Sequence, residues 1–353
     1  MDRTVRTALV GLGARGKVWA RLLTEERLAR LAGCVDVDPS NLRWVQGRFH
    51  VPDEACFSGL RPALAALRPD LVVLATPPID RYRQALEVFE SGAHLLCEKP
   101  LALDLGEAVR IVETAEQAQR GLAVGVNFRY QHAITRARLI FAAGEIGAPN
   151  FARYTYWRNR DGMLPRLNKY PLTMRQPMLY EQTIHHVDAL RFVYGAEVER
   201  VWCRCHNPRW SMYRDDATAV AALEMTGDLL VNYAGTWAAQ TKMTQFLWRT
   251  DCDDGALFQH EMFSDLRIAR GKDAETAERI ALPDQEPLVD DARLLLRHVL
   301  EQLLDGSTAP EPSGRDHLRT LAVIAACERS HRTGRRIDMH EFLGDQGVPA
   351  AWR

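Results

Sequence analysis

The sequence has little that would mark an extracellular or membrane protein. No apolar run approaches the roughly 20 residues that a membrane-spanning helix needs, and the first residues lack the apolar core of a signal peptide. The seven cysteines are scattered and form no CxxC pair. Cys203 and Cys205 are predicted to lie on one face of a strand as buried free thiols rather than metal ligands. We therefore expect a cytoplasmic protein without disulfides, a membrane partner or a metal site.

The chain also lacks an excess of charge of either sign. It has 45 basic and 46 acidic residues, for a formal net charge of −1. A general nucleic-acid-binding protein needs a basic footprint, so we expect no such partner. The composition is otherwise that of a globular protein, with 46% hydrophobic and 26% charged residues. A length of 353 residues is usually divided between two domains.

Short apolar runs alternate with helical patterns in the N-terminal third of the chain. The predicted strands are 7–10, 31–37, 71–75, 94–97 and 122–126, and the predicted helices are 17–28, 41–49, 81–91 and 105–120. Strands that alternate with helices indicate a parallel sheet covered on both faces. We therefore predict an α/β Rossmann domain over residues 1–126.

The pattern changes in residues 127–353, where strand-like runs follow one another. The predicted strands are 198–205, 217–225, 229–235, 246–250, 256–261 and 263–269, and the predicted helices are 133–143, 180–194, 290–304 and 315–333. This order predicts an α+β C-terminal domain built on a mostly antiparallel open sheet. Because no later helices would cover the outer face of that sheet fully, we expect a homodimer or a homotetramer.

A glycine-rich turn directly follows the first predicted strand and opens a helix. Its residues are Gly11, Leu12, Gly13, Ala14, Arg15 and Gly16. In this context Gly11 permits a tight turn, Gly13 lets the backbone approach a pyrophosphate, and Gly16 lets helix and strand pack closely. The N-terminus of the helix then offers free N–H groups to the phosphates. The turn predicts a dinucleotide-binding site.

Asp36, 20 positions after Gly16 and at the end of the second strand, selects the cofactor. Its carboxylate can accept hydrogen bonds from the ribose hydroxyls of NAD. A 2′-phosphate would instead bring like charges to ~4 Å, at a cost of roughly 1–4 kcal/mol for each pair. The neighbouring Val37 and Asp38 supply no compensating cation. NAD is therefore the predicted cofactor.

Three further segments occur in the order that a known family shows. They are Ala75-Thr76-Pro77-Pro78, Cys97-Glu98-Lys99-Pro100 and the run from Glu181 through His185 to Asp188. With the glycine turn, they make the chain resemble the Gfo/Idh/MocA oxidoreductases over nearly its whole length. The resemblance implies a catalytic role for Lys99, a cis Lys99–Pro100 bond, and cofactor contacts from the glycine turn, Asp36, Thr76, Pro77, Glu98, Lys99 and Asn127.

The third segment has helical spacing. Glu181, His185 and Asp188 are spaced i, i+4 and i+7, so they are predicted to share one side of helix 180–194, with His186 pointing away. The resemblance implies a catalytic histidine at His185 and an acidic residue four positions before it. That acid is usually aspartate in the family, and here it is Glu181. We count His185 and Asp188 also among the substrate-binding residues.

Two regions have less definite patterns. Arg81 stands where family members often carry a histidine, and the sequence leaves open whether it touches the cofactor or is solvated. Between residues 153 and 175 we predict a substrate-binding loop, in which Tyr156 and Arg158 contact the substrate. Other arginines, lysines and aromatic residues are interleaved there, namely Arg153, Arg160, Arg166, Lys169, Arg175, Tyr154, Trp157 and Tyr170. These basic residues could bind an anionic sugar substrate. The alternative is a solvated loop, whose charges serve solubility.

The predicted reaction moves a hydride between a secondary alcohol of a sugar, polyol or sugar derivative and nicotinamide. His185 is the predicted general base, and Lys99 stabilises the negative charge that develops on the same oxygen. Some relatives are NAD-dependent glycoside hydrolases that oxidise a sugar transiently, and the same residues can begin that chemistry. A non-catalytic NAD-binding regulator is the other alternative.

Overall fold

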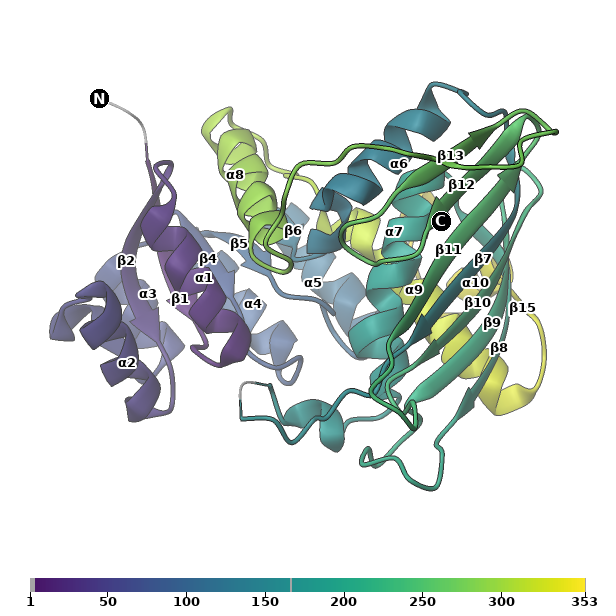
Figure 1. Cartoon of the computed structure of the whole chain (residues 1–353). Helices are drawn as coiled ribbons and strands as arrows, with labels where there is room; N and C mark the ends of the chain where they lie inside the picture. Colours follow the sequence, from purple (N-terminus) through teal and green to yellow (C-terminus); the bar gives the residue numbers. More distant parts are fainter. Residues whose placement is uncertain (1–3, 166, 353) are drawn as a thin grey trace. The chain divides into compact units, whose positions relative to one another are not determined.

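The computed structural model describes residues 4–165 and 167–352. The chain divides into two compact units (Figure 1). The first unit runs to Asn127 and also contains Ala292–Leu318; the second unit contains Phe128–Asp291 and the chain from Arg319 onward. Within the described residues, no helix is long and apolar enough to cross a membrane.

The first unit is a parallel six-stranded sheet in the order β3-β2-β1-β4-β5-β6. The strands are β1 (Val5–Val10), β2 (Ala29–Val35), β3 (Cys56–Phe57), β4 (Leu71–Leu74), β5 (His94–Cys97) and β6 (Leu122–Val124). The helices between them are α1 (Ala14–Glu25), α2 (Pro39–Phe49), η1 (Asp53–Ala55), α3 (Leu60–Leu67), α4 (Arg81–Glu90) and α5 (Leu105–Gln117). The predicted Rossmann fold is confirmed. The short strand β3 and the helix α3 were not predicted from the sequence.

The strand order reverses between β1 and β4, which are neighbours in the sheet. Ligands of open α/β sheets bind outside the carboxyl ends of the strands at such a reversal. The glycine turn follows β1 directly, and the Thr76-Pro77 segment follows β4. The topology therefore places both segments at the expected binding edge.

Residues Ala292–Leu318 belong to the first unit, although the predicted C-terminal domain, residues 127–353, included them. Helix α8 (Asp290–Leu304) places Arg293 beside Glu25, at 2.8 Å, and Arg297 beside Glu26, at 3.1 Å. These ion pairs join residues about 270 positions apart, so no pattern in the local sequence predicts them.

The second unit is built on a nine-stranded sheet in the order β14-β13-β12-β11-β7-β10-β9-β8-β15. Its strands are β7 (Pro149–Trp157), β8 (Val198–His206), β9 (Thr218–Met225), β10 (Leu229–Thr236), β11 (Gln245–Cys252), β12 (Gly255–Gln259), β13 (Arg267–Arg270), β14 (Glu278–Arg279) and β15 (Ile337–Asp338). Each neighbouring pair is antiparallel except β7 and β10, which run parallel. The predicted mostly antiparallel sheet is confirmed.

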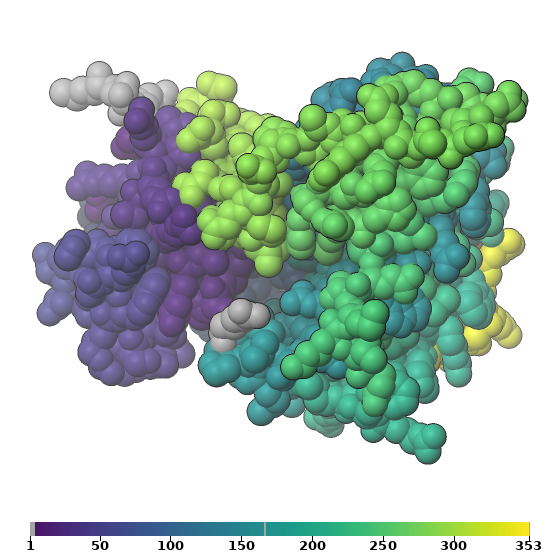
Figure 2. Space-filling view, in the orientation of Figure 1, coloured from purple at the N-terminus to yellow at the C-terminus, as the bar shows by residue number. Residues whose placement is uncertain are grey.

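Helices lie against one face of this sheet (Figure 1). They are α6 (His132–Ala142), α7 (Ile184–Tyr194), α9 (Gly314–Thr333) and α10 (Met339–Asp345). The shorter helical turns of this part of the chain are η2 (Asn127–Tyr130), η3 (Tyr170–Leu172), η4 (Met178–Thr183) and η5 (Ala350–Trp352). Residues 271–289 form a largely exposed strap, light green in the space-filling view (Figure 2). Gln285 fastens the strap, since its side chain bonds the backbone of Tyr130 and of His132.

Strand β7 corrects the prediction of a substrate-binding loop that starts at residue 153. Residues 149–157 pair with β10 on one side and with β11 on the other. Ala152, Tyr154 and Tyr156 alternate toward the buried face, as expected for a strand. The loop therefore begins only after Trp157. At the other end of the sheet, the strand predicted over 263–269 begins only at Arg267.

Candidate functional site

The glycine turn has the geometry that its sequence predicts. Gly11 has φ +88°, and a Cβ there would lie 2.9 Å from the backbone nitrogen of Thr76. A Cβ on Gly16 would lie 1.9 Å from the carbonyl oxygen of Gly11. Side chains are therefore excluded at both positions, which keeps the N-terminus of α1 close to β1 and open to a ligand. This cradle fits a dinucleotide pyrophosphate.

Asp36 joins the end of β2 to the glycine turn. One carboxylate oxygen accepts a hydrogen bond from the N–H of Leu12 at 2.5 Å, and the other accepts from the N–H of Asp38 at 2.8 Å. Both bonds orient the carboxylate beside the turn, where the ribose of a dinucleotide would be held. The next residue, Val37, is 87% exposed and adds no charge.

Arg81, whose role the sequence left open, is fully buried. Its guanidinium donates to the carbonyl of Thr76 at 2.6 Å, to the carbonyl of Glu98 at 2.6 Å and to the carbonyl of Pro100 at 3.5 Å. It therefore ties the segment after β4 to the segment after β5. The two carbonyls of the second segment flank Lys99, so Arg81 holds the backbone on both sides of this lysine.

Glu98 connects the segment after β5 to the glycine turn. Its carboxylate accepts from the guanidinium of Arg15 at 2.5 Å and from the indole of Trp19 at 2.8 Å. Burial by itself would raise the pKa of Glu98, but Arg15 holds that pKa below its ordinary value. Lys99 follows Glu98 and is half-buried, and the predicted cis Lys99–Pro100 bond is present. Lys99 thus stands beside the turn that fits the dinucleotide.

His185 belongs to the second unit, at the start of α7. The residue is 8% exposed, and its ring stacks on the ring of Phe128, with centroids 4.1 Å apart and planes 13° apart. The preceding turn, η4, is a π-helix, a form that is rare and frequent at functional sites. The helix predicted over 180–194 therefore begins in π-helical form and becomes α-helical at Ile184.

Glu181 lies within this π-helical turn and is half-buried. Its carboxylate accepts a hydrogen bond from the hydroxyl of Tyr170 at 2.5 Å. Tyr170 comes from the loop that follows β7, which the sequence reading included among the aromatic residues near the substrate. The bond fastens this loop to the turn that precedes His185.

His186 faces the sheet, as its place beside His185 on a helix requires. It is fully buried, with one ring nitrogen 2.8 Å from the amide of Gln182 and the other 3.0 Å from the hydroxyl of Tyr233. Burial lowers the pKa of His186 to about 3. This histidine is therefore a neutral part of the core.

Asp188 has a different environment from the one we predicted. It is fully buried, and its two oxygens accept from the guanidinium of Arg129, each at 2.6 Å. The hydroxyl of Thr320 also donates to it, at 3.1 Å. Because these partners occupy the carboxylate, we revise the predicted substrate contact at Asp188 to a structural one.

The predicted sugar-binding side chains are dispersed. Tyr156 is buried and packs edge-on against His186, at 5.0 Å between centroids. Arg160 donates to the hydroxyl of Tyr213 and lies over the ring of Trp237. The ammonium of Lys169 donates to two carbonyls of its own loop, those of Gly162 and Leu164. Arg158 is exposed at the start of the loop, and Arg166 lies outside the described residues.

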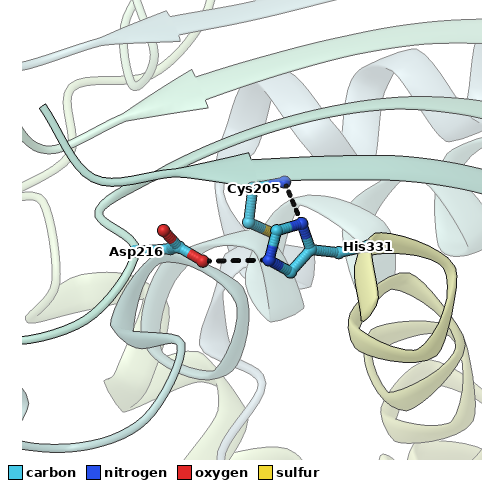
Figure 3. A group of neighbouring side chains, drawn as sticks. All are labelled: Cys205, Asp216 and His331. Carbon is cyan, nitrogen blue, oxygen red and sulfur yellow. Dashed lines mark hydrogen bonds and ion pairs between the residues drawn. The ribbon is translucent and has the colours of Figure 1, made fainter. Parts of the chain in front are cut away.

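The described residues also contain a group that the sequence reading did not foresee, Cys205, Asp216 and His331, whose potential metal-ligand atoms lie within 4.8 Å of one another (Figure 3). Nδ1 of His331 accepts from the backbone N–H of Cys205, so the ring proton resides on Nε2 and points to Asp216, 3.3 Å away. Asp216 also accepts from Gln176 at 2.8 Å. Strand β15 pairs with β8 only at Val201 and Arg200. His331 therefore accepts the hydrogen bond of the Cys205 N–H, farther along the edge of β8. We therefore assign the group a structural role.

Fold and site together define an NAD-binding oxidoreductase, and comparison with known proteins agrees. Residues 5–126 match the model described as "Oxidoreductase family, NAD-binding Rossmann fold", and residues 134–257 match the "GFO/IDH/MocA C-terminal domain". The chain belongs to the Gfo/Idh/MocA oxidoreductase family, and its first unit binds NAD.

Three relatives illustrate the similarity. The chain is 26% identical to D-apiose dehydrogenase of Paraburkholderia graminis over 94% of this chain and 89% of that protein. It is 31% identical to inositol 2-dehydrogenase of Acidothermus cellulolyticus over 57% and 56%, respectively. An oxidoreductase from Agrobacterium radiobacter, solved with NAD+, L-tartaric acid and magnesium, superposes with a TM-score of 0.87 at 21% identity, covering 96% of this chain and 99% of that one. This last likeness shows the shared fold.

Proposed function

We propose that this protein is an NAD-dependent dehydrogenase that oxidises a secondary alcohol of a sugar or polyol. The observation that carries the proposal is the bond between Glu98 and Arg15, because it joins the residue before Lys99 to the NAD-binding turn. A lysine held beside the nicotinamide cofactor is suited to stabilise charge on a reacting oxygen. The substrate class is supported by the relatives named for D-apiose and inositol.

In the proposed reaction each polar group has one task. Bound NAD supplies the carbon that accepts the hydride. His185 accepts the proton of the substrate hydroxyl, and Lys99 donates a hydrogen bond to the same oxygen as its negative charge develops. Glu181 orients the turn that precedes His185, through its bond with Tyr170. Arg158, exposed at the start of the loop after β7, is a candidate for a contact with an anionic substituent.

A panel of free sugars, polyols and sugar acids, incubated with NAD and followed by the absorbance of NADH, tests the function. Net formation of NADH from one member of the panel is the expected result. Cleavage of a glycoside without net NADH would identify an NAD-dependent glycoside hydrolase instead. Tight NAD binding without turnover of any sugar or glycoside would indicate a regulator.

We also propose that the protein is a homodimer or homotetramer. The face of the nine-stranded sheet opposite the helices exposes large apolar residues from four strands, namely Phe151, Trp202, Val220 and Leu230. Exposed apolar surface of this kind is typical of subunit interfaces. Light scattering coupled to size-exclusion chromatography measures the mass, and a mass of 39.9 kDa, that of one chain, would contradict this proposal.

We propose the cytoplasm as the site of action. All seven cysteines are free, as expected for a protein in a reducing compartment. Fractionation of cells that express the protein, with detection by antibody, is the test.

A further inference from the structure

We propose that Phe128 is a positioning residue for His185, and that the buried ion pair between Arg129 and Asp188 holds Phe128 in place. The inference rests on the proposed function, in which His185 is the general base. It concerns residues of the second unit only, and it gives a task to two residues that the sequence reading did not single out.

The histidine ring needs an external constraint. Rotation about χ2 of histidine has broad minima, so the side chain's own torsional preference does not fix the direction of its nitrogens. Phe128 provides the constraint, because the two rings are nearly parallel at 4.1 Å between centroids. Turning the imidazole about χ2 would drive its edge into the phenyl ring. The stack therefore fixes the plane of the His185 ring, and with it the direction of the nitrogen lone pair that accepts the proton, because that lone pair lies in the ring plane.

Phe128 is itself held on two sides. It is 5% exposed, and the ring of Phe263 meets it edge-on, at 5.9 Å between centroids and 84° between planes. Phe263 also lines a cleft of about 1000 Å³ beneath the strap 271–289. The position of the phenyl ring is thus set by packing on one side and by His185 on the other.

The backbone that carries Phe128 is fixed by its neighbour in sequence. Arg129 forms a two-pronged pair with Asp188, with both N–O distances at 2.6 Å and side chains that are 11% and 0% exposed. Such a planar fork fixes direction as well as distance. Asp188 lies three residues after His185, on the same helix α7. The ion pair therefore ties the segment of Phe128 to the helix that carries the histidine, one turn away from it.

The test uses steady-state kinetics on the substrate that the panel identifies. Phe128→Leu keeps an apolar side chain but removes the flat face, and we expect kcat to fall by roughly 10- to 100-fold, the scale expected for a misplaced catalytic group. KM for the substrate should change much less. Phe128→Tyr keeps the ring and should restore most of kcat. Phe246→Leu is the matched control, since Phe246 is 8% exposed and packs edge-on against Tyr154; it should leave kcat near the wild-type value.

The double variant with His185→Ala decides whether Phe128 acts through the histidine. If it does, Phe128→Leu should cause no further loss in the His185→Ala background. Equal losses in both backgrounds would overturn the positioning role, while leaving the proposed function intact. Near wild-type activity of His185→Ala alone would instead refute the general base of the proposed function. The two failures are therefore distinguishable.

The ion pair is tested by Arg129→Lys, which keeps the charge but loses the fork. We expect a lower kcat with little change in KM, and no additional effect when Phe128 is already leucine. Circular dichroism and NAD affinity show whether the variant is folded. A folded Arg129→Lys variant with wild-type kcat would show that the ion pair does not hold Phe128 in place. The Phe128 variants would still test whether Phe128 positions His185.

Discussion

The carboxylate of Glu98, at the end of β5, accepts a hydrogen bond from the guanidinium of Arg15 in the glycine turn. The two residues are 83 positions apart, yet they join the segment that binds the cofactor to the segment that carries Lys99. Because Arg15 keeps the pKa of the buried Glu98 below its ordinary value, this carboxylate is charged at neutral pH. The cofactor turn and Lys99 are therefore parts of one rigid edge of the sheet.

Asp36 should enforce NAD over NADP, because its carboxylate is oriented by Leu12 beside the turn. Asp36→Ser should weaken NAD binding and relax discrimination against NADP, measured as the ratio of the two kcat/KM values. The control is Asp38→Ser, since Asp38 is exposed and caps α2 through Ser40. A wild-type protein that uses NADP at least as well as NAD would contradict the assignment of Asp36.

Lys99→Ala should lower kcat by about 10²- to 10⁴-fold, the usual scale for a group that assists proton transfer. NAD binding, followed by titration of intrinsic fluorescence, should be nearly unchanged. Lys17→Ala is the control, because the ammonium of Lys17 lies over the ring of Trp44 on α2. Near wild-type kcat in Lys99→Ala would exclude the proposed role.

Glu181 and His185 should behave as a unit. His185→Ala should nearly abolish turnover, and Glu181→Gln should have a smaller effect, since a glutamine can still accept from Tyr170. In a double-mutant cycle on kcat/KM, the double variant should be little worse than His185→Ala. Strictly additive losses would mean that Glu181 acts independently, for example directly on the substrate.

His186 should make the fold sensitive to acid. Its pKa is lowered from 6.5 to about 3 in the folded protein, so the unfolded chain binds more protons between these values. The contribution of the neutral His186 to the free energy of unfolding is therefore fully present above about pH 6.5. It is lost as the pH falls toward 3, with a limiting slope of about 1.4 kcal/mol per pH unit. Urea unfolding at pH 7, 6 and 5 measures this slope. His186→Gln should reduce the slope, and an unchanged slope would exclude His186 as its source.

Arg81 should matter for both stability and cofactor binding. Arg81→Met would leave the carbonyls of Thr76 and Glu98 without their donor. The buried carbonyl of Glu98 alone would cost about 1–3 kcal/mol. We expect a lower free energy of unfolding and weaker NAD binding. Arg83→Met is the control two residues away, because Arg83 is exposed and pairs with the carboxylates of Asp80 and Glu87 rather than with backbone carbonyls near Lys99. Equal effects of the two substitutions would show that Arg81 does not hold the segment after β4 to the segment after β5.

The sequence by itself determined the features whose signals are local. The glycine turn, the spacing from Gly16 to Asp36, and the alternation of strands and helices each follow from short-range backbone geometry. They were sufficient to predict the Rossmann fold and the cofactor. The family was predicted from a resemblance, which the segments around Thr76, Lys99 and His185 carry. The same resemblance implied the cis Lys99–Pro100 bond that the structure contains.

The tertiary structure decided what each long polar side chain touches. Asp188 and Arg129 are 59 residues apart, and nothing in helical spacing shows that the arginine would occupy the carboxylate. The same holds for the buried Arg81, two of whose partners, the carbonyls of Glu98 and Pro100, lie in the segment after β5. A side chain's role depends on which distant groups the fold brings within about 3 Å of it, and periodicity along the chain carries no information about those partners.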